Sequence, residues 1–63
     1  MNMSNFSDTI TNIERALEEL KVDQAKVEKG VTKAARRVRK HFQFIAKSCK
    51  EGRAQVLALS KKQ

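Results

Sequence analysis

The sequence of 63 residues contains no proline and no tryptophan, and it has only two glycines. Proline and glycine interrupt helices most strongly, whereas the residues that dominate here, Ala, Leu, Lys, Glu, Arg and Gln, all favour helix. Residues that favour strands never alternate with polar residues over a useful length. We therefore expect an all-α protein.

Cysteine and histidine are almost absent, since Cys49 and His41 are the only ones. A disulfide within the chain is excluded, and one cysteine with one histidine gives no metal site of recognisable spacing. We expect no metal and no cofactor. The serines, the histidine and the acids form no pattern that suggests a nucleophile with its base, so we do not expect an enzyme.

No run of eighteen apolar residues occurs, so no segment is predicted to span a membrane. Residues 1–6 lack the order of basic and then apolar residues that marks a signal peptide. We expect a cytoplasmic protein made of one helical domain, residues 1–63. A chain this short buries few apolar side chains, so we also expect a homodimer or a higher homo-oligomer.

Acidic residues are scarce in the second half of the chain. Residues 1–28 carry six acids and three bases, a net charge of −3, whereas residues 29–63 carry eleven bases and one acid, a net charge of +10. Within this half, residues 33–50 contain seven bases and no acid, yet apolar residues recur at helical spacing. A structured helix with one apolar and one positive side is indicated, and its partner should be a polyanion.

Apolar residues follow alternating steps of four and three residues in both halves, which is the heptad pattern of helices that pack side by side. The first stripe consists of Phe6, Ile10, Ile13, Leu17, Leu20 and Val27, with Gln24 at the missing step. The second consists of Val31, Ala35, Val38, Phe42, Ile45, Cys49, Gly52, Val56 and Leu59. We expect these stripes to form the core or an oligomer interface.

Gly30 separates the two stripes. Glycine readily adopts the left-handed conformation that ends helices, so we expect one helix over about 5–28, a turn at 29–32 and a second helix over about 32–60. Ser4 or Asn5 is the expected N-cap of the first helix, and Thr32 of the second. The two helices would form an antiparallel hairpin that pairs into a coiled-coil-like bundle. The alternative is one long helix through Gly30 in a coiled coil, since one glycine costs only about 1 kcal/mol.

If the second stripe faces inward, most of the cations of this helix face outward at about 100° per residue. A row of outward-facing cations suits binding to phosphates, because an arginine guanidinium group can bind two phosphate oxygens at once and each lysine adds a positive charge. No module that reads bases is recognisable, so contacts should be to the nucleic-acid backbone. The expected DNA-binding residues are Lys33, Arg36, Arg37, Arg39, Lys40, Lys47, Lys50 and Arg53. RNA remains an open alternative.

Phe44 breaks the pattern, because it falls among the outward cations. A second oligomer contact would cover it, and contact with nucleic acid would use it as a wedge or a stacking surface. An exposed side chain without a role is the third possibility.

The segments Val27-Glu28-Lys29-Gly30, Lys33-Ala34-Ala35 and Arg37-Val38-Arg39-Lys40 resemble the linker-histone-like nucleoid proteins of chlamydiae and their short relatives in Bacteroidetes. The resemblance covers roughly residues 24–60. It implies a DNA-binding protein that condenses the bacterial nucleoid, and it carries over to Arg37, Arg39, Lys40, Lys47 and Arg53. Val31 stands where that family usually has a polar residue. The long Lys/Ala/Pro-rich tail of the chlamydial members is not part of this sequence, so we expect bridging to depend on an oligomer.

Three functions compete. The leading hypothesis is a histone-like, nucleoid-associated protein that compacts or bridges DNA without sequence specificity. The second is a helical coiled-coil interaction module that binds no nucleic acid. The third is a basic amphipathic helix on an anionic membrane, which the narrow stripe without tryptophan disfavours.

Overall fold

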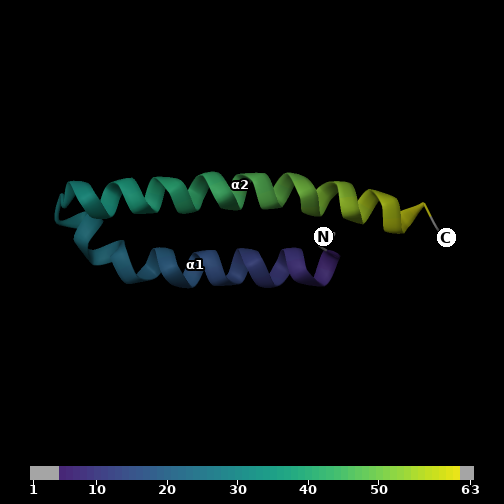
Figure 1. Cartoon of the computed structure of the whole chain (residues 1–63), viewed down its shortest axis with the longest axis horizontal. Helices are drawn as coiled ribbons and strands as arrows, with labels where there is room; N and C mark the ends of the chain where they lie inside the picture. Colours follow the sequence, from purple (N-terminus) through teal and green to yellow (C-terminus); the bar gives the residue numbers. More distant parts are fainter. Residues whose placement is uncertain (1–4, 62–63) are drawn as a thin grey trace.

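In the computed structural model, which describes residues 5–61, two helices lie antiparallel and form a hairpin (Figure 1). Helix α1 spans Phe6–Glu28 and helix α2 spans Thr32–Ser60. No strand occurs among the described residues. The molecule measures 49 × 18 × 17 Å, and the C-terminal part of α2 projects beyond the start of α1 (Figure 1). The expected all-α hairpin is confirmed, and the alternative of one long helix is wrong.

The turn between the helices depends on Gly30, whose φ is +87°. The Gly30 N–H donates to the Val27 carbonyl at 2.9 Å, and the Val31 N–H donates to the Lys26 carbonyl at 2.9 Å. These two bonds define a Schellman motif, which satisfies the last carbonyls of α1. A side chain at residue 30 would strain this left-handed backbone. The glycine therefore turns the chain instead of merely interrupting one helix.

The two helices begin differently. At the start of α1, the Asn5 side chain accepts a hydrogen bond of 2.8 Å from the Asp8 N–H, which is a standard N-cap. The other candidate, Ser4, lies outside the described residues. The prediction that Thr32 caps α2 is wrong, because Thr32 is already the first helical residue. Val31 occupies the N-cap position with extended backbone and makes no side-chain cap bond, because the side chain of valine has no hydrogen-bond acceptor.

The contact between the helices is made mostly by small and polar side chains. The buried residues are Thr9, Ala16 and Asp23 on α1, and Ala34, Val38 and Ser48 on α2. On α1 they recur every seven residues, and on α2 the half-buried His41 and Gln55 extend the same spacing from Ala34 and Ser48. Small residues at the contact bring the two helix axes close together. The core is therefore a thin line along the hairpin.

This contact does not coincide with the two expected apolar stripes. Of the twelve large apolar residues in those stripes, only Val38 is buried. Four are half-buried: Ile13, Leu20, Val27 and Ile45. Seven are exposed: Phe6, Ile10, Leu17, Val31, Phe42, Val56 and Leu59. Cys49 is exposed as well. Of the two expected roles of the stripes, the core of a single hairpin takes only Val38 from their large residues, and their role in an oligomer interface remains a prediction.

The exposed members gather on one side of the hairpin. With 100° per residue around the helix axis, each exposed member lies about 40–100° from the nearest residue of the seven-residue repeat that its own helix turns toward the other helix. The rotation has the same sense on both helices. Because the helices are antiparallel, equal senses bring both sets to the same face. A groove of about 410 Å³ on this face is lined by residues of both helices, among them Leu17, Leu20 and Val38. We call Phe6, Ile10, Leu17, Val31, Phe42 and Val56 the apolar face.

Candidate nucleic-acid interface

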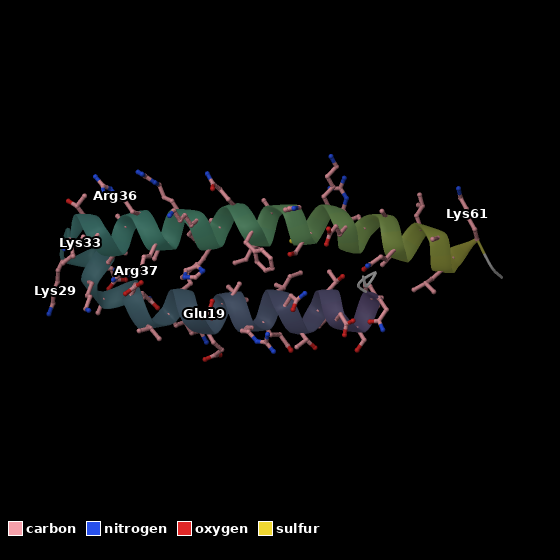
Figure 2. The ribbon with its side chains drawn as sticks, viewed as in Figure 1. Glu19, Lys29, Lys33, Arg36, Arg37 and Lys61 are labelled. Carbon is pink, nitrogen blue, oxygen red and sulfur yellow. The ribbon has the colours of Figure 1, made fainter. Side chains whose placement is uncertain are left out.

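The positive charge of α2 is directed away from α1. Counted from the buried Ala34, five exposed cations fall on the opposite half of α2, and we call them the cationic face. They are Arg36, Arg39, Lys40, Lys47 and Lys50. Lys33 and Arg53 lie at its two edges, with Arg53 next to the apolar face. Figure 2 shows Arg36 extending from α2 on the side away from α1.

The cationic face is not neutralised by the chain itself. Among residues 5–61, the acid-to-base contacts within 4.0 Å involve Lys21 with Glu18, Arg37 with Asp23, and His41 with Glu19. None of them uses Arg36, Arg39, Lys40, Lys47 or Lys50. The only acid of α2 is Glu51. These five side chains therefore present their charge to solvent, where an anionic partner can reach them.

Lys29 and Lys33 add charge at the closed end of the hairpin. Both side chains are exposed, and Figure 2 shows them at the tip where the chain turns. Lys29 is the last residue before Gly30 and caps α1 with its backbone. The positive surface thus extends from the turn along α2. From Lys33 to Lys50 it covers about 26 Å, at about 1.5 Å per residue.

Arg37 differs from the other expected DNA-binding residues, because its side chain points toward α1 instead of outward (Figure 2). Its Nε lies 2.8 Å from one carboxylate oxygen of Asp23, and its Nη2 lies 3.0 Å from the other. This is a bidentate arginine–carboxylate ion pair. The Asp23 side chain is 8% exposed and that of Arg37 is 51% exposed. Contact of Arg37 with a phosphate remains a prediction, in which the phosphate must compete with Asp23.

The pair shifts the titration of both groups. The hydrogen bonds from Arg37 lower the pKa of Asp23 below its ordinary value, although burial of the carboxylate opposes this shift. The carboxylate in turn raises the pKa of Arg37. Both groups are therefore held in their charged forms. The acidic first helix and the basic second helix are joined here by a defined contact between residues 14 apart in the chain.

Sequence reasoning did not identify Asp23 as important. The signal was present, because Asp23 follows Thr9 and Ala16 at steps of seven residues. These are the positions that α1 buries. A buried carboxylate needs a cationic partner, and an antiparallel hairpin turning at Gly30 places Asp23 beside Arg37. Hydrophobic periodicity alone passes over such a line of small and polar residues.

Phe44 lies on the side opposite the apolar face. It is 45% exposed and lines a shallow hollow of about 210 Å³ with residues of both helices, including Arg15, Glu19 and His41. The His41 Nδ1 lies 3.8 Å from a Glu19 carboxylate oxygen, a contact that is ionic only when the histidine is protonated. Phe44 is therefore partly packed against polar neighbours, and the structure assigns it no ligand.

The described part of the chain offers neither a metal site nor a membrane span. Residues 5–61 contain no cluster of three or more His, Cys, Asp or Glu side chains that would hold a metal ion. No helix of this region is long and apolar enough to cross a membrane.

Comparison with protein families agrees with this picture. Residues 7–62 match the family described as histone H1-like protein Hc1. This match covers most of the chain, so the chain belongs to the histone H1-like Hc1 family, as the resemblance to the chlamydial proteins implied. It is a family of DNA-binding architectural proteins and is not a known enzyme family. Neither the curated proteins nor the solved structures yielded a match to this chain.

Proposed function

We propose that this chain is a histone-like architectural protein of the bacterial nucleoid, that it acts in the cytoplasm, and that it binds the DNA backbone through α2. One observation carries the proposal: Arg36, Arg39, Lys40, Lys47 and Lys50 form a cationic face that α1 does not cover. The acids of α1 leave this face unpaired. Membership of the Hc1 family supports the same reading. DNA is the proposed ligand, and RNA is tested as the alternative.

The dimensions of the cationic face suit a duplex. From Arg36 to Lys50 its length is about 21 Å, which corresponds to roughly six base pairs at 3.4 Å each. Arginines can bind phosphate oxygens in pairs, and lysines contribute charge to the same row. The side chains of the face come from one straight helix without a second element that enters a groove. Binding through phosphates alone carries little sequence information, so the protein should bind unrelated duplexes about equally.

A matched pair of triple variants tests the proposal. In the first, Arg36, Arg39 and Lys40 are all replaced by Gln on the cationic face. In the second, the three bases of α1 are replaced: Arg15, Lys21 and Lys26. Both variants lower the net charge from +7 to +4. The first should weaken binding to all duplexes and reduce the slope of log affinity against log salt by about 3. Equal losses in both variants would show that net charge, not the cationic face, determines binding.

A second candidate function is favoured by the exposed apolar face. A helical assembly module that binds no nucleic acid would need such a face and would use the charge only for solubility. It predicts association that survives high salt, together with no affinity for DNA even at low salt. Binding measured with the wild-type chain at about 50 mM salt separates the two functions.

A further inference from the structure

The hairpin exposes far more surface than a compact chain of its mass. Its accessible surface is 5318 Å², whereas a folded monomer of 7.2 kDa is expected to expose about 4100 Å². The excess of about 1200 Å² exceeds the roughly 800 Å² that each partner buries in a standard protein interface. The surface that remains uncovered includes the apolar face, where Leu17 is 42% exposed and Phe42 is 55% exposed.

The apolar face has the periodicity of a helical partner. Phe6, Ile10 and Leu17 on α1 are separated by four and seven residues, and Val31, Phe42 and Val56 on α2 by eleven and fourteen. These spacings place each set on one side of its helix. The face runs along the hairpin on both helices, so its occupant must be long, apolar on one side and helical. A second copy of this chain has that length and that pattern.

We propose that two hairpins pair through their apolar faces into a four-helix bundle, in which the two α2 helices occupy diagonally opposite corners. The contribution of this bundle to bridging rests on the proposed DNA binding, whereas the bundle itself does not. Four-helix bundles bury such stripes between two helical layers. The small residues of the hairpin, including Ala16 and Ala34, then hold each layer together, and the large residues hold the two layers together.

Charge complementarity selects the diagonal arrangement. Helix α1 carries six acids and three bases, a net charge of −3, whereas α2 carries eight bases and one acid, a net charge of +7. A two-fold axis parallel to the helices places each α2 beside the partner's α1. The other two-fold arrangement places α2 beside the partner's α2, which brings two strongly positive helices together. The first arrangement lowers this repulsion.

The diagonal arrangement has a consequence for DNA. The cationic face lies on the side of α2 away from its own α1, and the apolar face lies about 100° from it. With the two α2 helices at opposite corners, the two cationic faces point in opposite directions. Each can then bind a separate duplex. A dimer of this kind would bridge two DNA segments, whereas a single hairpin would only coat one.

Mass and cross-linking without DNA test the bundle. The wild-type chain should sediment as a dimer, and Leu17→Gln and Phe42→Gln should lower its mass toward that of the monomer. Val22→Gln and Leu57→Gln are the controls, because both residues are exposed, at 77% and 59%, and lie off the apolar face. They should leave the dimer intact. A monomeric wild-type chain at about 100 µM, or a loss of dimer in the controls alone, would overturn the proposal.

Cross-linking distinguishes the two arrangements, and its first measurement uses the wild-type chain. The single native thiol, Cys49, is exposed. If the two-fold axis is parallel to the helices, each residue of α2 and the same residue of the partner's α2 lie at the same level along the bundle. A short bis-maleimide should therefore link Cys49 to its copy, and it should also link Phe42→Cys or Val56→Cys in a Cys49→Ser background. With antiparallel neighbouring α2 helices at most one of these three positions meets its copy. Cross-linking at one position only, or none, would overturn the diagonal arrangement.

A bridging assay then separates this inference from the proposed function. A duplex fixed to beads should capture a second, labelled duplex in the presence of the wild-type chain. Phe42→Gln should still bind a single duplex but should capture less of the second. If the wild-type chain dimerises but binds no duplex, the proposed function fails and the bundle stands. If Phe42→Gln is monomeric yet bridges as well as the wild type, the bundle is not what bridges DNA.

Discussion

The guanidinium of Arg37 holds both carboxylate oxygens of Asp23 across the two helices, at 2.8 Å and 3.0 Å. This pair joins the acidic helix to the basic one within the contact between the helices, where Asp23 is buried. It also removes one arginine from the row of cations that face solvent. Two residues that look alike in the sequence, Arg36 and Arg37, therefore have different surroundings.

Substitution of these two neighbours should separate DNA binding from hairpin stability. Arg36→Gln should weaken DNA binding and reduce the salt slope by about 1, with little change in melting temperature. Arg37→Gln should instead lower the melting temperature, because it leaves the buried Asp23 carboxylate without its partner. Fluorescence anisotropy and thermal unfolding followed by circular dichroism measure the two effects. Equal effects of both variants on both quantities would contradict the division of roles.

The stability of the hairpin should fall in acid because of Asp23. Its pKa is lowered in the folded chain from an ordinary value of 3.8, so the unfolded chain binds the proton more readily. The contribution of the pair is therefore complete above about pH 4 and is lost as the pH falls through the lowered pKa. Thermal unfolding between pH 2 and pH 7 should show this loss in the wild type.

Asp23→Asn is the control for this acid dependence. The variant should melt at a lower temperature than the wild type at pH 7, because the amide cannot form a charged pair with Arg37. Its melting temperature should also vary less between pH 2 and pH 4, since the titrating group is gone. An acid dependence as steep as that of the wild type would show that other carboxyl groups are responsible.

The two glycines should respond to alanine in opposite directions. Gly30 has φ +87°, where a side chain costs about 1–2 kcal/mol, so Gly30→Ala should destabilise the hairpin. Gly52 lies within α2, and a Cβ placed there would meet the Thr9 Cγ2 at 3.5 Å, an ordinary contact. Gly52→Ala should therefore stabilise the chain by about 0.5–1 kcal/mol. Chemical unfolding at one fixed protein concentration measures both, since association affects apparent stability.

The small residues between the helices should not tolerate enlargement. Ala34 is 0% exposed, and Ala34→Leu should destabilise the hairpin by about 1–3 kcal/mol through overpacking. Ala54→Leu is the matched control, because Ala54 lies on the exposed outer side of α2 and should change stability by less than about 0.5 kcal/mol. A neutral Ala34→Leu would mean that the helices do not approach closely at this point.

The sequence allowed the hairpin to be predicted but not the way in which its helices face each other. Glu28-Lys29-Gly30 indicated the turn because a left-handed position favours glycine, and the helix formers on both sides left few alternatives. The residues at the contact between the helices were not identified, because hydrophobic periodicity gives weight to large side chains such as Leu17 and Phe42. In the hairpin, small residues such as Ala16 and Ala34 make the contact, and the large ones remain on the apolar face.

The positive surface was also predictable only in part. The outward direction of Arg36 follows from helical periodicity, because no partner on α1 competes for it. The direction of Arg37 depends on Asp23, and that contact exists only after the chain has turned. Residues 14 apart in the sequence cannot be paired without knowing the register of the two helices. The DNA-binding roles of the cations remain predictions that direct binding measurements must test.

The most direct test of DNA binding through the backbone is a salt titration of the wild-type chain. Anisotropy would be measured with two unrelated DNA duplexes and one RNA duplex, between about 50 and 300 mM salt. With about 4–6 phosphates contacted per chain, log affinity should fall with log salt at a slope of about −4 to −5, and both DNA duplexes should bind alike. A flat salt response, or no binding at the lowest salt, would contradict the account, and preferential binding to RNA would reassign its ligand.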